Sequence, residues 1–168
     1  MNGMIVGKFA PIHIGHLSMF TETLELCDNL MIIMCFDSRW VQKQPKEIRN
    51  CLGYEIRQKQ LNAMVFKLRK IFPTKTILTT TIIEDEIPEY PNGWKEWANL
   101  IKEEVSRENY VVDKIFSNEI SYISNFDKYF PEWSHVLLYT NRTKISISST
   151  KIREAMQITL NNSLFNIV

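Results

Sequence analysis

The sequence has no excess of charge of either sign. Its 20 basic and 19 acidic residues are interspersed along the chain and leave a net charge of +1. Because nucleic acids and anionic membrane surfaces are attracted by a concentrated basic field, we expect neither as a partner. Small molecules are the ligands that this composition favours.

Paired cysteines and long apolar segments are also missing. The three cysteines, Cys27, Cys35 and Cys51, are odd in number and have no CxxC spacing, so we expect reduced thiols. No segment reaches the roughly 20 consecutive apolar residues of a membrane span, and the first residues do not have the pattern of an export signal. We therefore expect a cytoplasmic protein, either a monomer or a homo-oligomer.

The length of 168 residues fits a single domain spanning 1–168. Apolar periodicity predicts strands at 4–6, 30–36, 76–83, 114–116 and 135–139, helices at 17–27, 61–72, 94–105 and from about 149 onward, and polar loops at 37–50, 84–93 and 140–146. The unbroken apolar run 30–36 is typical of a parallel strand covered on both faces. The alternation predicts an α/β fold, a Rossmann-like, doubly wound parallel sheet of about five strands.

Polar candidates follow the carboxyl ends of the expected strands, where ligands bind in such sheets. They are residues 7–16 after the first strand, Asp37 after the second, Glu84 and Asp85 after the third, and 117–119 after the fourth. We expect these segments to converge on one site.

The segment from Gly7 to His16 has the features of a phosphate site. His13 and His16 stand three residues apart where a loop turns into a helix, so their rings can share one face of its first turn. Free backbone N–H groups and the helix dipole favour an anion there, Gly7 and Gly15 allow close approach, and Lys8 adds a cation. A chance pair of capping and surface histidines is the alternative; a zinc site is disfavoured because a third His or Cys is lacking.

A second candidate anion site lies near the C-terminus. Ser148 and Thr150 are small hydroxyl residues leading into a helix whose first turns carry Lys151 and Arg153. Cations at a helix start oppose the dipole, so a nearby phosphate would explain them. The alternative is an ordinary Ser/Thr cap with solvated cations.

The segments from Gly7 to His16 and from Ile147 to Arg153 resemble the (H/T)xGH and ISxTxxR signatures of the nucleotidyltransferase superfamily. The segment 83–94, which ends in Tyr-Pro-Asn-Gly-Trp, is similar to an element of the NadR-type nicotinamide mononucleotide (NMN) adenylyltransferases. The resemblance extends from Gly7 to about Arg153. It departs from the family pattern at Ser117-Asn118-Glu119, where the family has Ser-Ser-Glu.

The resemblance implies transfer of an adenylyl group from ATP to NMN, giving NAD and pyrophosphate without a covalent intermediate. It implies that Mg²⁺ accompanies ATP and that no protein side chain serves as a resident metal ligand. The implied catalytic residues are Lys8, His13, His16 and Arg153. The implied ATP-binding residues are Gly7, Phe9, Gly15, Ser117, Ser148, Thr150 and Lys151. The implied NMN-binding residues are Asp37, Arg57, Asp85, Tyr90, Asn92 and Trp94.

Several of these assignments have alternatives. Trp94 can stack on the pyridinium ring of NMN or pack in the core, since it lies on an apolar helical stripe with Trp97. Asp85 or its neighbours can hold the carboxamide or ribose of the substrate, or they can be solvated loop charges. Arg57 can pair with the NMN phosphate or lie on the exposed side of its helix. His135 is expected to have no role in the site.

Three rival functions also fit parts of the sequence. Another adenylyl- or cytidylyltransferase, such as phosphopantetheine adenylyltransferase, would share both phosphate motifs. A class I aminoacyl-tRNA synthetase is disfavoured by the near-neutral charge. A sensor that binds ATP or NAD without turnover is the third. The sequence contains no GxxxxGK[ST] phosphate loop and no room before Gly7 for a helix-turn-helix, so we expect neither kinase nor repressor activity in this chain.

Overall fold

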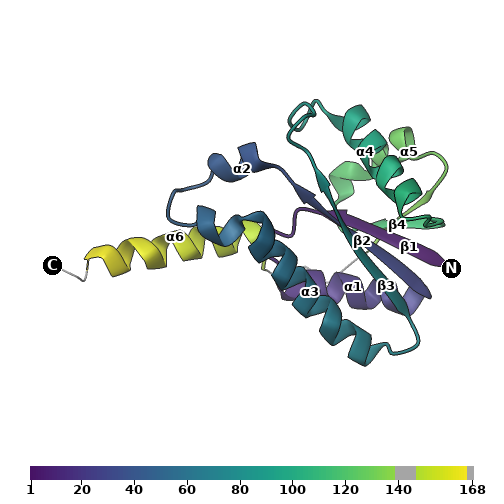
Figure 1. The fold of residues 1–168 in the computed structure, drawn as a ribbon, viewed down its shortest axis with the longest axis horizontal. Coiled ribbons are helices and arrows are strands. Elements are labelled where there is room, and N and C mark those ends of the chain that lie inside the picture. Colours follow the sequence, from purple (N-terminus) through teal and green to yellow (C-terminus); the bar gives the residue numbers. More distant parts are fainter. Residues whose placement is uncertain (139–146, 166–168) are drawn as a thin grey trace.

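The computed structural model describes residues 1–138 and 147–165, with side chains as far as Thr159. In these residues, five strands form one sheet in the order β3-β2-β1-β4-β5, and every neighbouring pair is parallel (Figure 1). The strands are β1 (Asn2–Gly7), β2 (Asn29–Phe36), β3 (Thr76–Ile83), β4 (Lys114–Ser117) and β5 (Ser134–Leu137). The expected doubly wound parallel sheet is confirmed.

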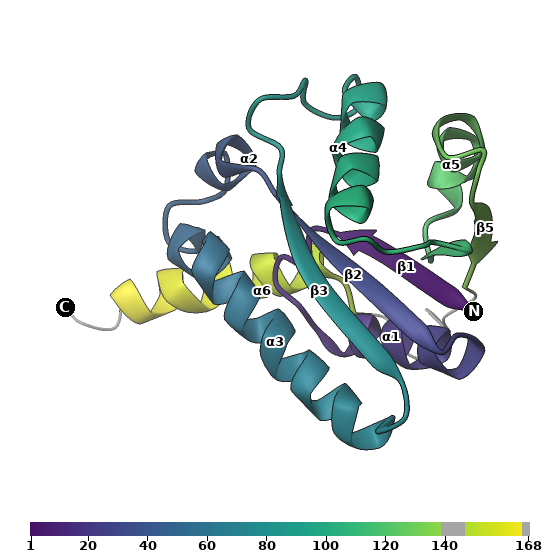
Figure 2. The same cartoon turned by 45° about the vertical axis from the view of Figure 1, so that its right-hand side comes forward.

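Helices cover both faces of the sheet. They are α1 (Ile14–Leu26), α2 (Ser38–Gln42), α3 (Tyr54–Ile71), α4 (Trp94–Arg107), α5 (Ile123–Tyr129) and α6 (Ser149–Phe165), with the 3-10 helices η1 (Arg49–Leu52) and η2 (Ile120–Tyr122). In both views α1 and α3 lie on one side of the strands and α4 and α5 on the other, and α6 extends away from the sheet (Figures 1 and 2).

The core follows from the period-two alternation of the strands. Ile5 and Ile32 belong to the apolar cluster beneath α1 and α3, whereas Met4, Met31 and Ile33 belong to the cluster beneath α4 and α5. All five are 0% exposed. Successive side chains of a strand point to opposite faces, so a strand buried on both faces needs an unbroken apolar run, as in β2.

Four short elements were not expected, namely α2, η1, η2 and α5. The predicted loop 37–50 contains α2 and the start of η1, and α5 lies in a segment for which no helix was predicted. With five and seven residues, α2 and α5 are too short to show a 3.6-residue apolar period. The helix α3 begins at Tyr54, earlier than expected, because its first turns carry mainly polar side chains. The predicted loop 140–146 and Tyr139 lie outside the described residues.

None of the described helices is long and apolar enough to cross a membrane.

The site is positioned by the topology. Strand order reverses between β1 and β4, because the chain builds β1, β2 and β3 towards one edge and then β4 and β5 towards the other. In open parallel sheets, ligands bind beyond the carboxyl ends of the strands at this reversal. Gly7 and Ser117 end the two strands concerned.

Candidate active site

The two histidines of the first motif cap α1 with their own side chains. His13 is the N-cap residue, and its Nδ1 accepts a hydrogen bond of 3.0 Å from the Gly15 backbone N–H. The His16 Nδ1 accepts one of 3.1 Å from the His13 backbone N–H. Since Nδ1 is an acceptor in both rings, the neutral tautomer carries its hydrogen on Nε2. Each ring can therefore offer an Nε2–H donor to a ligand.

Burial keeps these rings uncharged. The pKa of His16 is lowered to about 3, mainly by desolvation and to a smaller extent by the nearby His13. Desolvation also lowers the pKa of His13. The ring centroids are only 3.9 Å apart, so two imidazolium ions would repel each other. At neutral pH in the free protein the pair supplies hydrogen-bond donors, and positive charge for a ligand comes from Lys8, Lys151 and Arg153.

The lowered pKa predicts a pH dependence of stability. The folded state disfavours protonation of His16, while the unfolded chain takes up that proton near pH 6.5. The contribution of neutral His16 to the free energy of unfolding is therefore fully present above this pH and is lost as the pH falls towards 3. We expect the free energy of unfolding to fall between pH 6 and 4 more steeply in the wild type than in His16→Asn, by up to about 1 kcal/mol per pH unit. Denaturant titrations at several pH values measure this, and equal slopes would contradict it.

The second motif is anchored on the first. The Ser149 hydroxyl donates to the Pro11 carbonyl over 3.0 Å, and Arg153 Nη1 donates to the Ala10 carbonyl over 2.6 Å. Arg153 Nη2 donates to the Thr150 hydroxyl over 3.1 Å. The Ser148 hydroxyl accepts from the Lys151 backbone N–H over 3.2 Å, as a helix cap does. The two ends of the described chain thus build one surface.

A cavity of about 780 Å³ opens between these motifs. Ten of the eleven predicted catalytic and ATP-binding residues line it: Gly7, Lys8, Phe9, His13, Gly15, His16, Ser117, Ser148, Lys151 and Arg153. Thr150 is not among the lining residues and contacts Arg153 instead. The structure therefore brings the two candidate phosphate segments to one place.

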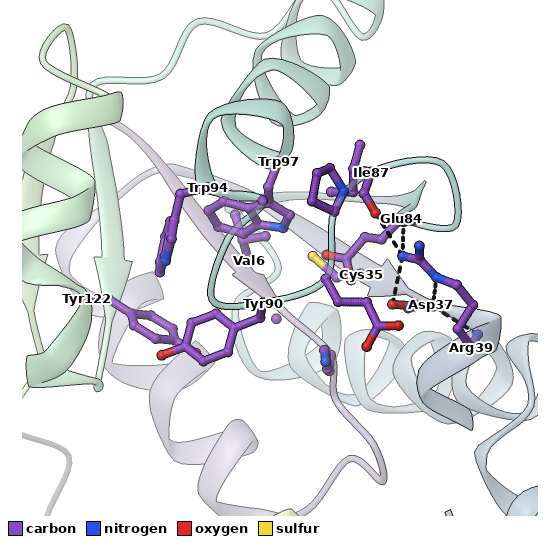
Figure 3. A pocket seen from close by; sticks show the side chains of 15 residues that line it. Val6, Cys35, Asp37, Arg39, Glu84, Ile87, Tyr90, Trp94, Trp97 and Tyr122 are labelled. Atoms are coloured by element: carbon purple, nitrogen blue, oxygen red, sulfur yellow. Dashed lines mark hydrogen bonds and ion pairs between the residues drawn. The ribbon is translucent and has the colours of Figure 1, made fainter. Parts of the chain in front are cut away.

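A second cavity, of about 330 Å³, lies beside the first and is shown in Figure 3. Aromatic side chains form one wall, where the Trp94 ring centroid lies 5.2 Å from that of Tyr122 and 6.1 Å from that of Tyr90. Trp97, Cys35, Asp37, Arg39 and Glu84 line other parts of it. Trp94 also packs at 6.1 Å from Phe126 of the core, so it has a structural contact as well as a cavity-lining position.

The two cavities adjoin at the end of β1. Val6, Gly7, Lys8 and Tyr122 line both of them. Lys8 is therefore the cation common to a pocket rich in anion-binding groups and a pocket walled by aromatic rings. A group bound in one cavity could be transferred to a ligand in the other without crossing bulk solvent.

The acidic loop after β3 is tied to α2. Asp85 accepts hydrogen bonds of 2.7 Å from both the backbone N–H and the hydroxyl of Ser38. Arg39 pairs with Asp37 at 3.0 Å and donates to the carbonyls of Glu84 and Ile87 at 2.7 and 3.0 Å. Burial opposes ionisation of Asp37, but the Arg39 and backbone hydrogen bonds outweigh it and lower its pKa. Asp85 thus fastens the loop and is not among the cavity-lining residues.

Glu84 is the carboxylate of this loop that lines the smaller cavity. It is 8% exposed, and burial raises its pKa against the opposing influence of Lys8, Cys35 and Trp97. In the structure Ile82 is buried and Ile83 is exposed, so the alternation of the strand puts Glu84 on the buried face. The two adjacent isoleucines do not show this alternation in the sequence. Of the two acidic residues that follow β3, Glu84 lines the smaller cavity and Asp85 does not.

Arg57 and Asn92 do not line either cavity. Arg57 is 1% exposed, donates to the Cys35 carbonyl over 3.0 Å and lies 4.9 Å from the Phe36 ring centroid. Burial lowers its pKa to about 10. The alternative that Arg57 lies on the exposed side of its helix is wrong, because it faces the sheet. Asn92 is exposed, and its backbone N–H closes a turn onto the Glu89 carbonyl.

Other contacts were not expected from the sequence. His135, for which no role was predicted, holds the Ser117 hydroxyl at 2.8 Å from its Nε2, behind the wall of the larger cavity. Trp40, Trp97 and Tyr122 line the cavities as well. Their roles depend on contacts between segments far apart in the chain, which periodicity does not report.

Gly93 shapes the smaller cavity through a close backbone approach. A Cβ added there would lie 2.0 Å from the Pro88 carbonyl oxygen, whereas one added at Gly53 would lie 3.8 Å from its nearest neighbour. Both glycines are helix N-cap residues without a side-chain cap. We expect Gly93→Ala to move the loop 88–93, to destabilise the protein by about 1–3 kcal/mol and to weaken binding in the smaller cavity. Thermal unfolding and ligand titration of Gly93→Ala and the control Gly53→Ala test this; equal behaviour would contradict it.

The described residues contain no group of three or more His, Cys, Asp or Glu side chains arranged to hold a metal ion. The side chains that line the two cavities include hydrogen-bond donors, cations, aromatic rings and carboxylates.

Residues 4–155 match the sequence profile of the cytidylyltransferase-like family. The chain belongs to this family, and the resemblance to the nucleotidyltransferase superfamily is confirmed. Among its relatives is the trifunctional NAD biosynthesis/regulator protein NadR of Escherichia coli (strain K12), 28% identical over 156 residues that make up 90% of this chain. The NadR of Salmonella typhimurium is 26% identical over the same length. The chain spans 36% of the length of these curated relatives.

Solved structures of NadR and of an NMN adenylyltransferase have a similar fold. A crystal structure of NadR in complex with NAD and AMP-PNP superposes with a TM-score of 0.61 at 27% identity, covering 91% of this chain and 41% of that one. NadR in complex with NR gives 0.64 at 27% identity, covering 91% and 40%. A bifunctional NMN adenylyltransferase/ADP ribose pyrophosphatase from Francisella tularensis gives 0.67 at 18% identity, covering 92% and 41%, which shows the shared fold.

Proposed function

We propose that this chain transfers the adenylyl group of ATP to NMN, giving NAD and pyrophosphate. The observation that carries the proposal is the meeting of the two cavities at Lys8, one lined by both phosphate motifs and the other walled by Trp94, Tyr90 and Tyr122. A NadR structure in complex with NAD and AMP-PNP and another in complex with NR support this proposal, because NAD is its expected product.

The aromatic cavity suits a cationic ring. The pyridinium ring of NMN carries a positive charge, and the faces of indole and phenol rings attract such a charge. The carboxyl groups of Glu84 and Asp37 line the same cavity and add to this preference when ionised. Choline phosphate shares the positive charge but lacks the flat ring, and phosphopantetheine lacks both.

The reaction needs no protein nucleophile. A phosphate oxygen of NMN attacks the α-phosphorus of ATP, the bond from this phosphorus to the bridging oxygen breaks, and pyrophosphate leaves with that oxygen. The chain contributes positioning and electrostatic stabilisation. The Nε2–H groups of His13 and His16 donate to phosphate oxygens, and Lys8 and Arg153 offset the negative charge that develops on the α-phosphate and the leaving group.

ATP enters this scheme as its Mg²⁺ complex. Mg²⁺ retains several waters and binds through substrate phosphates more often than through an all-protein cage. The phosphate oxygens of ATP can supply its ligands, in agreement with the side-chain composition of the larger cavity. EDTA in excess of Mg²⁺ is expected to stop turnover.

The proposal is tested by an acceptor panel. The purified chain is incubated with MgATP and NMN, nicotinate mononucleotide, phosphopantetheine or choline phosphate, and pyrophosphate release is measured. We expect turnover with NMN to exceed that with phosphopantetheine and choline phosphate by orders of magnitude. A preference for either of those two would assign the chain to another transferase of the superfamily, and tight ATP binding without turnover would make it a sensor.

Trp94 gives a separate prediction. If its face attracts the pyridinium ring, Trp94→Leu raises the KM for NMN about tenfold and leaves the KM for ATP unchanged, with Trp94→Phe in between. Trp133, which stacks on Phe130 at 5.1 Å and lines neither cavity, provides the control variant Trp133→Leu. Initial rates at varied NMN measure the effect. Equal KM values for the Leu and Phe variants would mean that Trp94 serves only in packing.

A further inference from the structure

Trp40 lies between the cations of the two phosphate motifs. It belongs to α2 and lines the larger cavity together with Lys8 and Arg153. The Lys8 Nζ is 5.0 Å from the centroid of its ring, and the Arg153 guanidinium carbon is 5.1 Å from it. The indole is therefore in contact with one cation from each end of the described chain.

The indole ring reduces the electrostatic repulsion between Lys8 and Arg153. Lys8 and Arg153 are long side chains with many rotamers, and they repel each other when no anion separates them. An indole face attracts cations within about 6 Å of its centroid more strongly than a phenyl ring does. The Trp40 ring therefore offsets part of the repulsion and restricts both side chains before a phosphate arrives.

The ring is itself held in place from behind. Trp40 packs on a buried cluster of Ala10, Val41, Ile48 and Leu52, which Met156 of α6 also contacts. Ala10 belongs to the first motif and Met156 to the helix of the second, so the ring is located relative to both. The start of α2 is fixed in addition by the hydrogen bonds that Asp37 accepts from the backbone of Arg39 and Trp40.

We propose that Trp40 is a positioning residue for adenylyl transfer, whose indole face places Lys8 and Arg153 for the polyphosphate of ATP. The role in transfer depends on the function proposed above, whereas the placing of the two cations for a polyphosphate does not depend on the acceptor. Preorganised cations favour binding of the polyphosphate and stabilise the transition state without reorganisation during the reaction, so the effect falls on both polyphosphate affinity and kcat.

The test compares side chains that fill similar space with and without a π face. Trp40→Phe keeps a weaker π face, Trp40→Leu has none, and site-specific incorporation of trifluorotryptophan at position 40 keeps the shape but withdraws electrons from the ring. We measure kcat for NAD formation and, independently, the Kd of inorganic tripolyphosphate by calorimetry. We expect losses of about threefold for Phe and about tenfold for Leu in both quantities, and of about fivefold for the fluorinated ring.

A double-mutant cycle with Lys8→Met separates positioning from packing. Once the Lys8 cation is removed, Trp40→Leu should cost about threefold at most, because only Arg153 remains to be placed. Equal losses for Phe and Leu, full activity of the fluorinated protein, or the same cost of Trp40→Leu in both backgrounds would overturn the proposal. The fluorinated protein preserves the test if Trp40→Leu fails to fold. If the wild type forms no NAD but tripolyphosphate affinity follows the ring ranking, the proposed function fails and the placing of the cations by Trp40 stands.

Discussion

Replacing His16 with asparagine is expected to lower kcat for NAD formation by about a hundredfold to a thousandfold, the usual effect of removing one preorganised donor to a developing negative charge. The amide oxygen of asparagine can accept the His13 backbone N–H that His16 Nδ1 accepts at 3.1 Å, so the cap of α1 is kept. The Nε2–H donor has no counterpart in asparagine. Steady-state rates at saturating ATP and NMN measure the loss.

Glutamine at the same position provides the matched control. Its longer side chain places an amide N–H near the former Nε2 but does not reproduce the Nδ1 acceptor. We expect His16→Gln to be less stable than His16→Asn and yet more active, so that stability and turnover change in opposite order. If the asparagine variant is as active as the wild type, His16 does not contact the reacting phosphates.

Removal of the Lys8 cation is expected to have the second large effect. Lys8 lines both cavities, so its ammonium can reach the phosphates of ATP and of NMN. Lys8→Met keeps the length of the side chain and removes the charge, and we expect kcat to fall about a hundredfold, with a smaller rise in both KM values. Initial-rate measurements with each substrate varied separate the two effects.

Lys114 offers a control for overall charge. It lies at the start of β4, at the opposite end of the strands from Gly7 and Ser117, and lines neither cavity. Lys114→Met changes the net charge by the same amount and is expected to leave kcat unchanged. A loss in Lys8→Met no larger than that in Lys114→Met would contradict a direct role for Lys8.

Much of the fold was predictable because strands and long helices carry periodic signals. The apolar run 30–36 predicted a doubly covered parallel strand, and β3 was predicted at its observed bounds Thr76–Ile83. The short helices α2 and α5 were not predictable, since one or two turns do not establish a period. Trp40 was missed for this reason, because it belongs to α2.

The larger cavity was more predictable than the smaller one. Each phosphate motif is local in sequence, with its histidines, hydroxyls and cations within a few residues, and the structure brings the two motifs together. The smaller cavity depends on which of two adjacent carboxylates faces inward and on aromatic contacts between α4 and the region of η2. Adjacent residues of an extended segment point in opposite directions, and the sequence does not show that Glu84, and not Asp85, lines this cavity. The orientation of Arg57 was left open by the sequence, because helical spacing alone does not show which side faces the sheet.

The central claim is that an adenylyl group passes directly between ligands in the two adjoining cavities. The most direct measurement is a single turnover with NMN and ATP labelled either at the α-phosphate or at the γ-phosphate, with the products separated by chromatography. We predict that the α-label appears in NAD, that the γ-label appears in pyrophosphate, and that neither label remains attached to the protein. Release of the α-label as AMP without NAD, or retention of label on the protein, would contradict the account.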